Sequence, residues 1–572
     1  MRTEPLVAML LPILLAIQML AAVEAPPPAA PDWHAQPARA QHAMVVTQQH
    51  FATEVGVDVL RHGGNAVDAA VAVGYALAVV DPCCGNIGGG GFMLIRMHDG
   101  REHFIDFRER APLRATPQLY QDKNGNLIPG LSTRGYLAVG VPGTVMGLER
   151  ARTEFGTRSR AALMAPAIAL ARNGYLIGPG DARIYRSLPS DAGVRAIFAP
   201  NGRTLQPGDT LTQPQLAKTL EAIARDGPSV FYRGAIANAI VNASTAHGGI
   251  LSLQDFASYN VDELKPVRCS YRGYELISAP PPSSGGVTLC EILNVLSPYP
   301  LARWSWNSGA SVHFAVEAER RAYADRNTYL GDPAFVKNPV AQLLAPQYAA
   351  KLRGTISANR ATPSTQIRPG LGAVAHENGE TTHYSIVDSA GNAVAVTYTI
   401  NDTFGAGVIA GDTGFLLNDE MDDFTSKPGV PNLYGLVQGA RNDIRGGKRP
   451  LSSMTPTIVT RNGQLFMVTG SPGGSRIITI VLATLQNVID YGMNVQDAVN
   501  APRIHMQWLP DLVEYEPGAL SAQTMAKLAT MGYSFKEVAG WGSAQAIVID
   551  PKSGMLMGGT DRRHAAGLAA GY

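Results

Sequence analysis

The stretch TTHYSIVDSAGNAVAVTYTIN, residues 381–401, is typical of two antiparallel strands joined by a tight turn. A three-residue loop at 389–391, with its glycine in the left-handed conformation, sets the pairing of the two strands. In that register Thr381 lies opposite Thr399, and Asn401 falls on the same face, whereas a two-residue loop would shift the register by one residue. The hairpin therefore predicts two hydroxyls and an amide together at one strand end, although Thr is also simply common in strands.

A segment without apolar periodicity precedes this hairpin. Residues 354–380 (GTISANRATPSTQIRPGLGAVAHENGE) are dominated by Pro, Gly, Ser, Thr and Asn, which is typical of an exposed linker. A structureless loop of this length is uncommon inside a compact chain and is usually functional. We therefore expect 355–380 to be a flexible linker that ends where the first strand begins.

A glycine-rich turn follows further along the chain. Residues 468–492 predict a strand, a turn and then a helix from about Ser475. The N–H groups of Gly473 and Gly474 would lie at the start of that helix, so they are a candidate oxyanion hole for acyl transfer. A phosphate loop is disfavoured because GxxxxGK[ST] is absent, and no GxSxG elbow is present. The other glycine run, 85–91, follows a helix rather than a strand and is a poor dinucleotide fingerprint.

The rest of the chain mixes helical and strand-like patterns without an internal repeat, which favours a layered α/β or α+β body. The clearest helical spacings are at 51–60, 66–80, 161–171, 216–224 and 312–323. Strand-like alternation is found at 103–109, 274–280, 383–389, 392–401 and 455–461.

Composition limits the classes of partner. The chain has 572 residues, of which 45% are hydrophobic, so it can bury a core. Its 47 Lys and Arg balance 46 Asp and Glu, a net charge of +1, so nucleic acid is not expected as a partner.

The N-terminus resembles a secretory leader. Arg2 precedes an apolar run at 6–20, and small residues follow it. We expect residues 1–25 to be a signal peptide, with cleavage after Ala22 or Ala25, although an uncleaved anchor is the alternative. The run is too short to span a bilayer comfortably, so we expect a periplasmic or secreted protein without a membrane span after removal of the leader.

The four cysteines, Cys83, Cys84, Cys269 and Cys290, do not form the pattern of a disulfide framework. The neighbours Cys83 and Cys84 are not expected to pair easily. A bridge between Cys269 and Cys290 is possible, although a buried free thiol is the commoner case. No CxxC pair or HExxH motif is present, so we expect no metal and no cofactor.

Many blocks of the sequence, in order, resemble the γ-glutamyltranspeptidase family. The similarity covers about 44–572, and its blocks are GGNAVDAAVA (63–72), GNIGGGGFML (85–94), DFRERAP (106–112), GVPGTVMG (140–147), PPPSSGG (280–286), ADRNTYLGDP (324–333), TTHYSIVD (381–388), TYTIN (397–401), LLNDEMDDF (416–424), KPGVPNLYGL (427–436), KRPLSSMTPTIV (448–459) and TGSPGGSRIIT (469–479).

This resemblance implies an α+β fold, the four-layered αββα sandwich of N-terminal-nucleophile hydrolases. It also implies a precursor that cuts itself between Glu380 and Thr381 into a large subunit, 26–380, and a small catalytic subunit, 381–572, which stay together as a heterodimer. The hydroxyl of Thr381 is a weak nucleophile, and only cleavage makes its own α-amino group available as a base. His383 lies two residues away, but a Thr–His pair is not expected because the amine already supplies a base.

The family's site residues carry over by position. The resemblance implies Thr381 as nucleophile, Thr399 as the hydroxyl that positions it, and Gly473 and Gly474 as the oxyanion hole. For a glutamyl substrate, it implies Arg108, Ser452 and Ser453 at the α-carboxylate, Asn401, Glu420 and Asp423 at the α-ammonium, and Tyr434 as gate of a lid at 427–439. Taken singly, Arg108 could be an ordinary ion pair and the serines could cap a turn.

The implied reaction is a ping-pong transfer of the γ-glutamyl group from glutathione or other γ-glutamyl amides to water, amino acids or short peptides. One alternative is an amidase for glutaryl or cephalosporin side chains, which would have less need of the polar residues at the ammonium. The other is a binding protein that has lost processing, but no lesion is seen at the threonines or the glycine pair.

Overall fold

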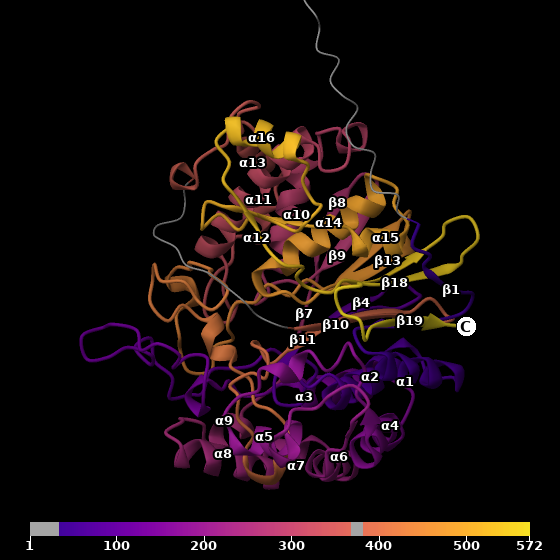
Figure 1. Cartoon of the computed structure of the whole chain (residues 1–572), viewed down its shortest axis with the longest axis vertical. Coiled ribbons are helices and arrows are strands. Elements are labelled where there is room, and N and C mark those ends of the chain that lie inside the picture. Colours follow the sequence, from indigo (N-terminus) through magenta and orange to yellow (C-terminus); the bar gives the residue numbers. More distant parts are fainter. Residues whose placement is uncertain (1–33, 368–380) are drawn as a thin grey trace, which may run out of the picture.

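Two seven-stranded sheets lie face to face between two layers of helices (Figure 1). The computed structural model describes residues 34–367 and 381–572. Helices α1–α9 cover one sheet and α10–α16 cover the other, so the predicted four-layered αββα fold is confirmed. The predicted signal peptide and Glu380 lie outside the described residues. Within the described ranges, no helix is both long enough and apolar enough to cross a membrane.

The first sheet carries the predicted hairpin at its centre. Its strands, in spatial order, are β19 (Leu568–Gly571), β2 (Met44–Thr47), β10 (Thr382–Val387), β11 (Ala393–Thr399), β3 (Gly90–Arg96), β4 (Glu102–Asp106) and β7 (Asp262–Leu264).

The second sheet and two smaller ones complete the strands. The second sheet has the order β1 (Ala38–Ala40), β18 (Leu556–Thr560), β17 (Gln545–Ile549), β13 (Gln464–Gly470), β12 (Thr457–Arg461), β9 (Tyr274–Ser278) and β8 (Val267–Tyr271). The smaller sheets consist of β14 (Ile504–His505), β15 (Val513–Tyr515) and β16 (Phe535–Glu537), and of β5 (Tyr175–Leu176) and β6 (Thr210–Leu211).

The helices match the predicted periodic segments. Those that cover the first sheet are α1 (His50–Arg61), α2 (Ala66–Val80), α3 (Thr144–Phe155), α4 (Arg160–Asn173), α5 (Ala192–Phe198), α6 (Pro214–Asp226), α7 (Pro228–Tyr232), α8 (Ala235–Ala246) and α9 (Leu253–Ala257). Those on the second sheet are α10 (Gly285–Leu296), α11 (Gly309–Tyr329), α12 (Val340–Leu343), α13 (Pro346–Arg353), α14 (Ile477–Ile489), α15 (Val495–Asn500) and α16 (Ala522–Thr530).

The register of the β10–β11 hairpin is the predicted one. Thr382 pairs with Tyr398, and Gly391 has the left-handed φ of +86° in the turn. Alternate residues of β11 pack on opposite sides of the sheet, as strand geometry requires. Ala393 and Ala395 belong to the core of the second sheet, and Thr399 has the same parity. The hydroxyl of Thr399 therefore lies on the side that faces the second sheet.

The part of the predicted linker that the structure describes, residues 355–367, is a mostly exposed loop with one 3₁₀ turn at Ser364–Gln366. Residues 355–367 lie against α11, where Thr362 donates from its backbone to Glu317 at 3.0 Å. Ser364 is buried and accepts a hydrogen bond from Arg320 at 2.9 Å. Polar side chains on α11 and the neighbouring loops thus bond a segment that has no apolar pattern of its own. The remainder of the predicted linker lies outside the described residues.

The structure corrects the predictions that Cys83 and Cys84 would not pair and that Cys269 and Cys290 would more commonly be free thiols. All four cysteines are in disulfides. Cys269 on β8 and Cys290 on α10 are joined across a helix–strand contact with a Cα–Cα separation of 5.8 Å, which is ordinary for a disulfide. Cys83 and Cys84 are joined to each other in a buried turn.

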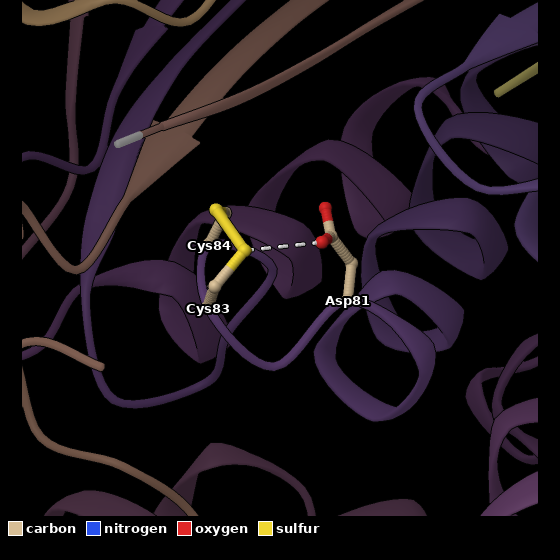
Figure 2. Close-up of side chains that lie close together, drawn as sticks. All are labelled: Asp81, Cys83 and Cys84. Atoms are coloured by element: carbon tan, nitrogen blue, oxygen red, sulfur yellow. Dashed lines mark hydrogen bonds between the residues drawn. A yellow bond between two sulfur atoms is a disulfide. The ribbon is translucent and has the colours of Figure 1, made fainter. Parts of the chain in front are cut away.

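Figure 2 shows the carboxyl group of Asp81 pointing at the Cys83–Cys84 pair. The Asp81 Oδ1 lies 3.3 Å from the Cys83 sulfur. Burial raises the pKa of Asp81 to about 7, and the hydroxyl of Thr382 lowers it in part. The three side chains are close enough to surround an ion, but the sulfurs are bonded to each other and offer no thiolate ligand.

Candidate active site

One small cavity at the end of the β10–β11 hairpin gathers most of the predicted site residues. Its volume is about 20 Å³, and Met454 and Ile477 complete its lining. The predicted residues that line it are Arg108, Thr381, Thr399, Asn401, Glu420, Asp423, Tyr434, Ser452, Ser453 and Gly474. Gly473 is the exception, because it borders a larger neighbouring pocket of about 300 Å³.

The two threonines meet as the hairpin register predicts. The side chain of Thr381 is buried, and its hydroxyl donates to the Thr399 Oγ1 at 3.3 Å. The backbone N–H of Asn401 donates to the same Thr399 oxygen at 2.8 Å. Asn401 has a left-handed φ of +78°, so the chain turns sharply after β11 and keeps its amide beside the threonines. The arrangement fixes the orientation of the Thr381 hydroxyl.

His383 is engaged elsewhere and cannot serve as the base. Its ring nitrogens contact the Thr397 Oγ1 at 2.8 Å and the Ser385 Oγ at 3.1 Å. Burial lowers the pKa of His383 to about 3, so the ring is neutral at physiological pH. A base for Thr381 must therefore come from another group.

The glycine pair lies where a strand passes into a helix. Gly473 and Gly474 follow β13 and have positive φ angles of +135° and +55°. A 3₁₀ turn, η9 (Gly474–Arg476), leads into α14, so the helix itself starts two residues later than predicted. A Cβ on Gly474 would overlap the ring of Tyr434. The pair therefore supplies N–H groups at a helix start, where a developing negative charge is favoured.

Arg108 lies among three buried carboxyl groups. It follows β4, and its guanidinium pairs with Glu420 and with Asp423, while the Glu109 Oε2 lies 3.7 Å away. Burial raises the pKa of Glu420 well above its usual range and also raises that of Asp423, and the charge of Arg108 opposes both shifts. Burial raises the pKa of Glu109 to about 7. The charge of Arg108 therefore favours the ionised forms of these buried acids.

A second buried arginine, Arg326 on α11, supports the serine pair. It donates to the Ser453 Oγ at 2.9 Å and to the Ser284 Oγ at 2.8 Å. Burial lowers its pKa to about 10, which still leaves it charged. Because the Ser453 oxygen accepts from Arg326, its own proton is free to be donated into the cavity. Sequence reasoning missed Arg326, although it lies inside the quoted block 324–333.

Ser452 has a mainly structural set of bonds. Its Oγ accepts from the Met454 N–H at 3.1 Å, as a turn-capping serine would. Its carbonyl oxygen accepts from the Ser284 hydroxyl at 2.6 Å. The Ser283 hydroxyl in turn bonds the Met454 carbonyl at 2.6 Å. The PPPSSGG block thus holds the serine loop in place.

Asn418 is a further residue that sequence reasoning did not single out. Its Oδ1 accepts from the Gly140 and Glu420 N–H groups at 2.9 and 3.1 Å. Its Nδ2 donates to the Gly88 carbonyl at 2.8 Å. This one side chain fixes the start of η7 (Glu420–Asp423), which presents both acids to Arg108.

The predicted lid, 427–439, is closed over the cavity. Tyr434 is buried, and its hydroxyl bonds both the side-chain and the backbone oxygen of Asn401. The Leu433 N–H donates to the Asp422 Oδ2 at 2.7 Å. Gln507 holds the loop from the far side, since its Nε2 donates to the Tyr434 carbonyl at 3.1 Å. Residues of the glycine turn, the hairpin and the lid therefore meet in one place.

Solved structures of other proteins share this architecture. A cephalosporin acylase from Bacillus halodurans is similar over 96% of this chain and 99% of its own, with a TM-score of 0.83 and 28% identity. A gamma-glutamyltranspeptidase from Helicobacter pylori is 44% identical over 60% of this chain and 98% of its own, with a TM-score of 0.55.

Sequence comparison is more specific. The chain is 53% identical to a glutathione hydrolase proenzyme of Pseudomonas sp. strain A14, over 94% of this chain and 95% of that protein. It is 49% identical to the glutathione hydrolase proenzyme of Escherichia coli K12, over 94% and 93% of the two chains. Residues 52–571 match the family described as gamma-glutamyltranspeptidase. The chain therefore belongs to the γ-glutamyltranspeptidase family.

Proposed function

We propose that this chain is an autoprocessing γ-glutamyltransferase and glutathione hydrolase. In this proposal, Thr381 takes the γ-glutamyl group of glutathione or a related amide and passes it to water, an amino acid or a peptide. The observation that carries the proposal is a single cavity in which a positioned threonine pair faces a guanidinium and its acids.

The charges of the cavity suit a substrate that carries both signs on one carbon. Without substrate, Arg108 is paired with Glu420 and Asp423. When substrate binds, its α-carboxylate can pair with Arg108 in place of Glu420 and Asp423. The α-ammonium then pairs with those two acids, so that no buried charge is left without a partner. Ser453 can add a hydrogen bond to the carboxylate. This exchange favours a free glutamyl α-carbon over an α-linked peptide, which lacks one of the two charges.

The chemistry follows the positions of the groups. The Thr381 Oγ attacks the γ-amide carbonyl carbon, and its proton passes through the freed α-amine to the leaving nitrogen. The N–H groups of Gly473 and Gly474 hold the oxygen that becomes negative. Water or a second amine then attacks the ester, which restores the threonine. No metal or cofactor is needed for these steps.

Activation requires that the Thr381 nitrogen become an amine. We place the cut between Glu380 and Thr381, which gives subunits 26–380 and 381–572 that stay together as a heterodimer. The shared sheet supports this, because β10 of the small part pairs with β2 of the large part. The leader-like N-terminus favours a periplasmic or secreted enzyme.

A side-chain amidase is the nearer alternative, because cephalosporin acylases share the fold. A glutaryl side chain lacks the α-ammonium. Here Asn401, Glu420 and Asp423 all line the cavity, and two of them are acids. These groups favour a substrate with the ammonium.

Intact mass spectrometry with a parallel assay of γ-glutamyl-p-nitroanilide tests the proposal. We expect two fragments, the smaller one beginning at Thr381, together with release of nitroaniline. A single full-length mass without release would contradict it and favour a binding protein. Faster cleavage of glutaryl-p-nitroanilide than of the γ-glutamyl compound would favour the amidase.

Tyr434→Phe tests the closed lid. The ring still covers Gly474, but the bond to Asn401 is lost, which is worth about 1 kcal/mol or roughly a fivefold change. We expect KM for γ-glutamyl-p-nitroanilide to rise about fivefold, and Tyr434→Ala to raise it further. The check is steady-state kinetics at fixed pH. Equal KM values for the Phe variant and the unchanged enzyme would mean that the hydroxyl does not hold the lid.

A further inference from the structure

The pocket beside Gly473 is separate from the cavity that holds the threonines. It has a volume of about 300 Å³, at the lower end of small-molecule pockets, while the threonine cavity has about 20 Å³. Residues that are adjacent in the sequence line the two spaces on either side of their common boundary. Gly473 and Asp402 line the large pocket, whereas Gly474 and Asn401 line the small one.

The positions of the two spaces suggest where each half of an amide substrate binds. If the carbonyl oxygen is held at the glycine pair, the glutamyl half lies on the Gly474 side with Arg108. The amine half must then leave on the Gly473 side, where the larger space is. The pocket lies on the route of the leaving group and of the incoming acceptor.

Three arginines line this pocket, and two of them form ion pairs with acidic side chains. Arg563 pairs with Glu516 and Asp561. Arg476 pairs with Glu514 at 2.6 Å and lies over the ring of Trp541.

Arg183 differs from the other two. Its side chain is exposed in the loop between β5 and α5, and it makes no ion pair with any part of the chain that the structure describes. The acid in the lining, Asp402, is bonded instead to Arg134 at 2.7 Å. The pocket thus offers one uncommitted guanidinium, which can grip a carboxylate with two parallel hydrogen bonds.

We propose that this pocket binds the amine half of the reaction, and that Arg183 binds the carboxylate of the departing dipeptide or of the acceptor. The inference rests on the proposed function and extends it from the glutamyl half to the other half. It predicts that leaving groups and acceptors with a free carboxylate are preferred over uncharged ones.

Arg183→Gln tests the inference through two ratios. The first is kcat/KM for glutathione divided by kcat/KM for γ-glutamyl-p-nitroanilide, whose leaving group has no carboxylate. The second is the acceptor efficiency of glycylglycine divided by that of glycylglycine amide. Since Arg183 is exposed and screened, we expect each ratio to fall about fivefold, and Arg183→Lys to restore part of it. In the unchanged enzyme, the same ratios should fall with added salt.

Arg186→Gln is the matched control. Arg186 lies three residues along the same loop, is also exposed, and is not in the pocket lining. It should leave both ratios unchanged. Ratios that are equal in Arg183→Gln and the unchanged enzyme, or that fall equally in the Arg186 control, would overturn the inference. If the unchanged enzyme releases no nitroaniline, the proposed function fails instead.

Discussion

Thr381→Ala leaves the protein as one uncut chain with no release from γ-glutamyl-p-nitroanilide. Both losses have the same cause, because in the proposed mechanism one hydroxyl attacks the preceding peptide bond and later the substrate. The Thr399 hydroxyl and the glycine pair remain in place, but they have no nucleophile to orient. We expect activity to fall by about four orders of magnitude or more, as when a covalent nucleophile is removed. A denaturing gel and the anilide assay measure the two effects.

Two variants make this test specific. Thr381→Ser keeps a hydroxyl and should still be cut, more slowly. Thr382→Val removes the neighbouring hydroxyl, which is buried outside the cavity lining, and should still be cut and active. Cleavage of Thr381→Ala at the same bond would refute the nucleophile assignment. Loss of cleavage in Thr382→Val but not in Thr381→Ala would move the assignment by one residue.

The hairpin shows what the sequence could predict. Strand alternation and one turn glycine are local signals, and together they fix the register that brings Thr381 to Thr399. The periodic helices were predictable for the same reason: α2, with buried residues all round, matches the predicted range 66–80. Local patterns of this kind need no knowledge of the rest of the fold.

The features that were missed depend on contacts between distant segments. Arg326 supports Ser453 across 127 residues of sequence, and nothing near either residue signals the other. Residues 355–367 are held by bonds to α11, which composition cannot reveal. The Cys269–Cys290 pair likewise depends on how α10 packs on β8. The family blocks pointed to residues that mostly line one cavity, but the polar contacts that support those residues could be found only in the folded chain.

Arg108→Gln has the second large expected effect, because it removes the guanidinium that pairs directly with two buried acids. Glu420 and Asp423 lose their cation while remaining buried, and leaving a buried charge alone costs about 3–5 kcal/mol. We expect a lower melting temperature and a fall in kcat/KM for γ-glutamyl-p-nitroanilide of at least about 100-fold. Arg108→Lys keeps the positive charge but loses the forked guanidinium that can form two parallel hydrogen bonds to a carboxylate. It should therefore mainly raise KM for γ-glutamyl-p-nitroanilide, by about tenfold or more.

The acids give this variant a distinct pH dependence. Burial raises the pKa of Glu420 and of Asp423, and the charge of Arg108 is the largest influence that lowers them. Without the guanidinium both pKa values rise, so the anionic forms that hold an α-ammonium exist only at higher pH. The residual activity of Arg108→Gln should therefore increase with pH over the range where that of the unchanged enzyme is flat.

A donor without the α-carboxylate separates binding from folding in the Arg108 variants. γ-Aminobutyryl-p-nitroanilide keeps the amide, the chain length and the ammonium group but lacks the α-carboxylate, so it gains nothing from the fork of Arg108. If Arg108 holds the carboxylate, Arg108→Lys weakens the γ-glutamyl donor by about tenfold more than the truncated one. If the arginine only neutralises the acids, both donors lose equally, and the carboxylate must be bound elsewhere. The ratio of the two losses decides the role, because a change in stability affects both donors alike.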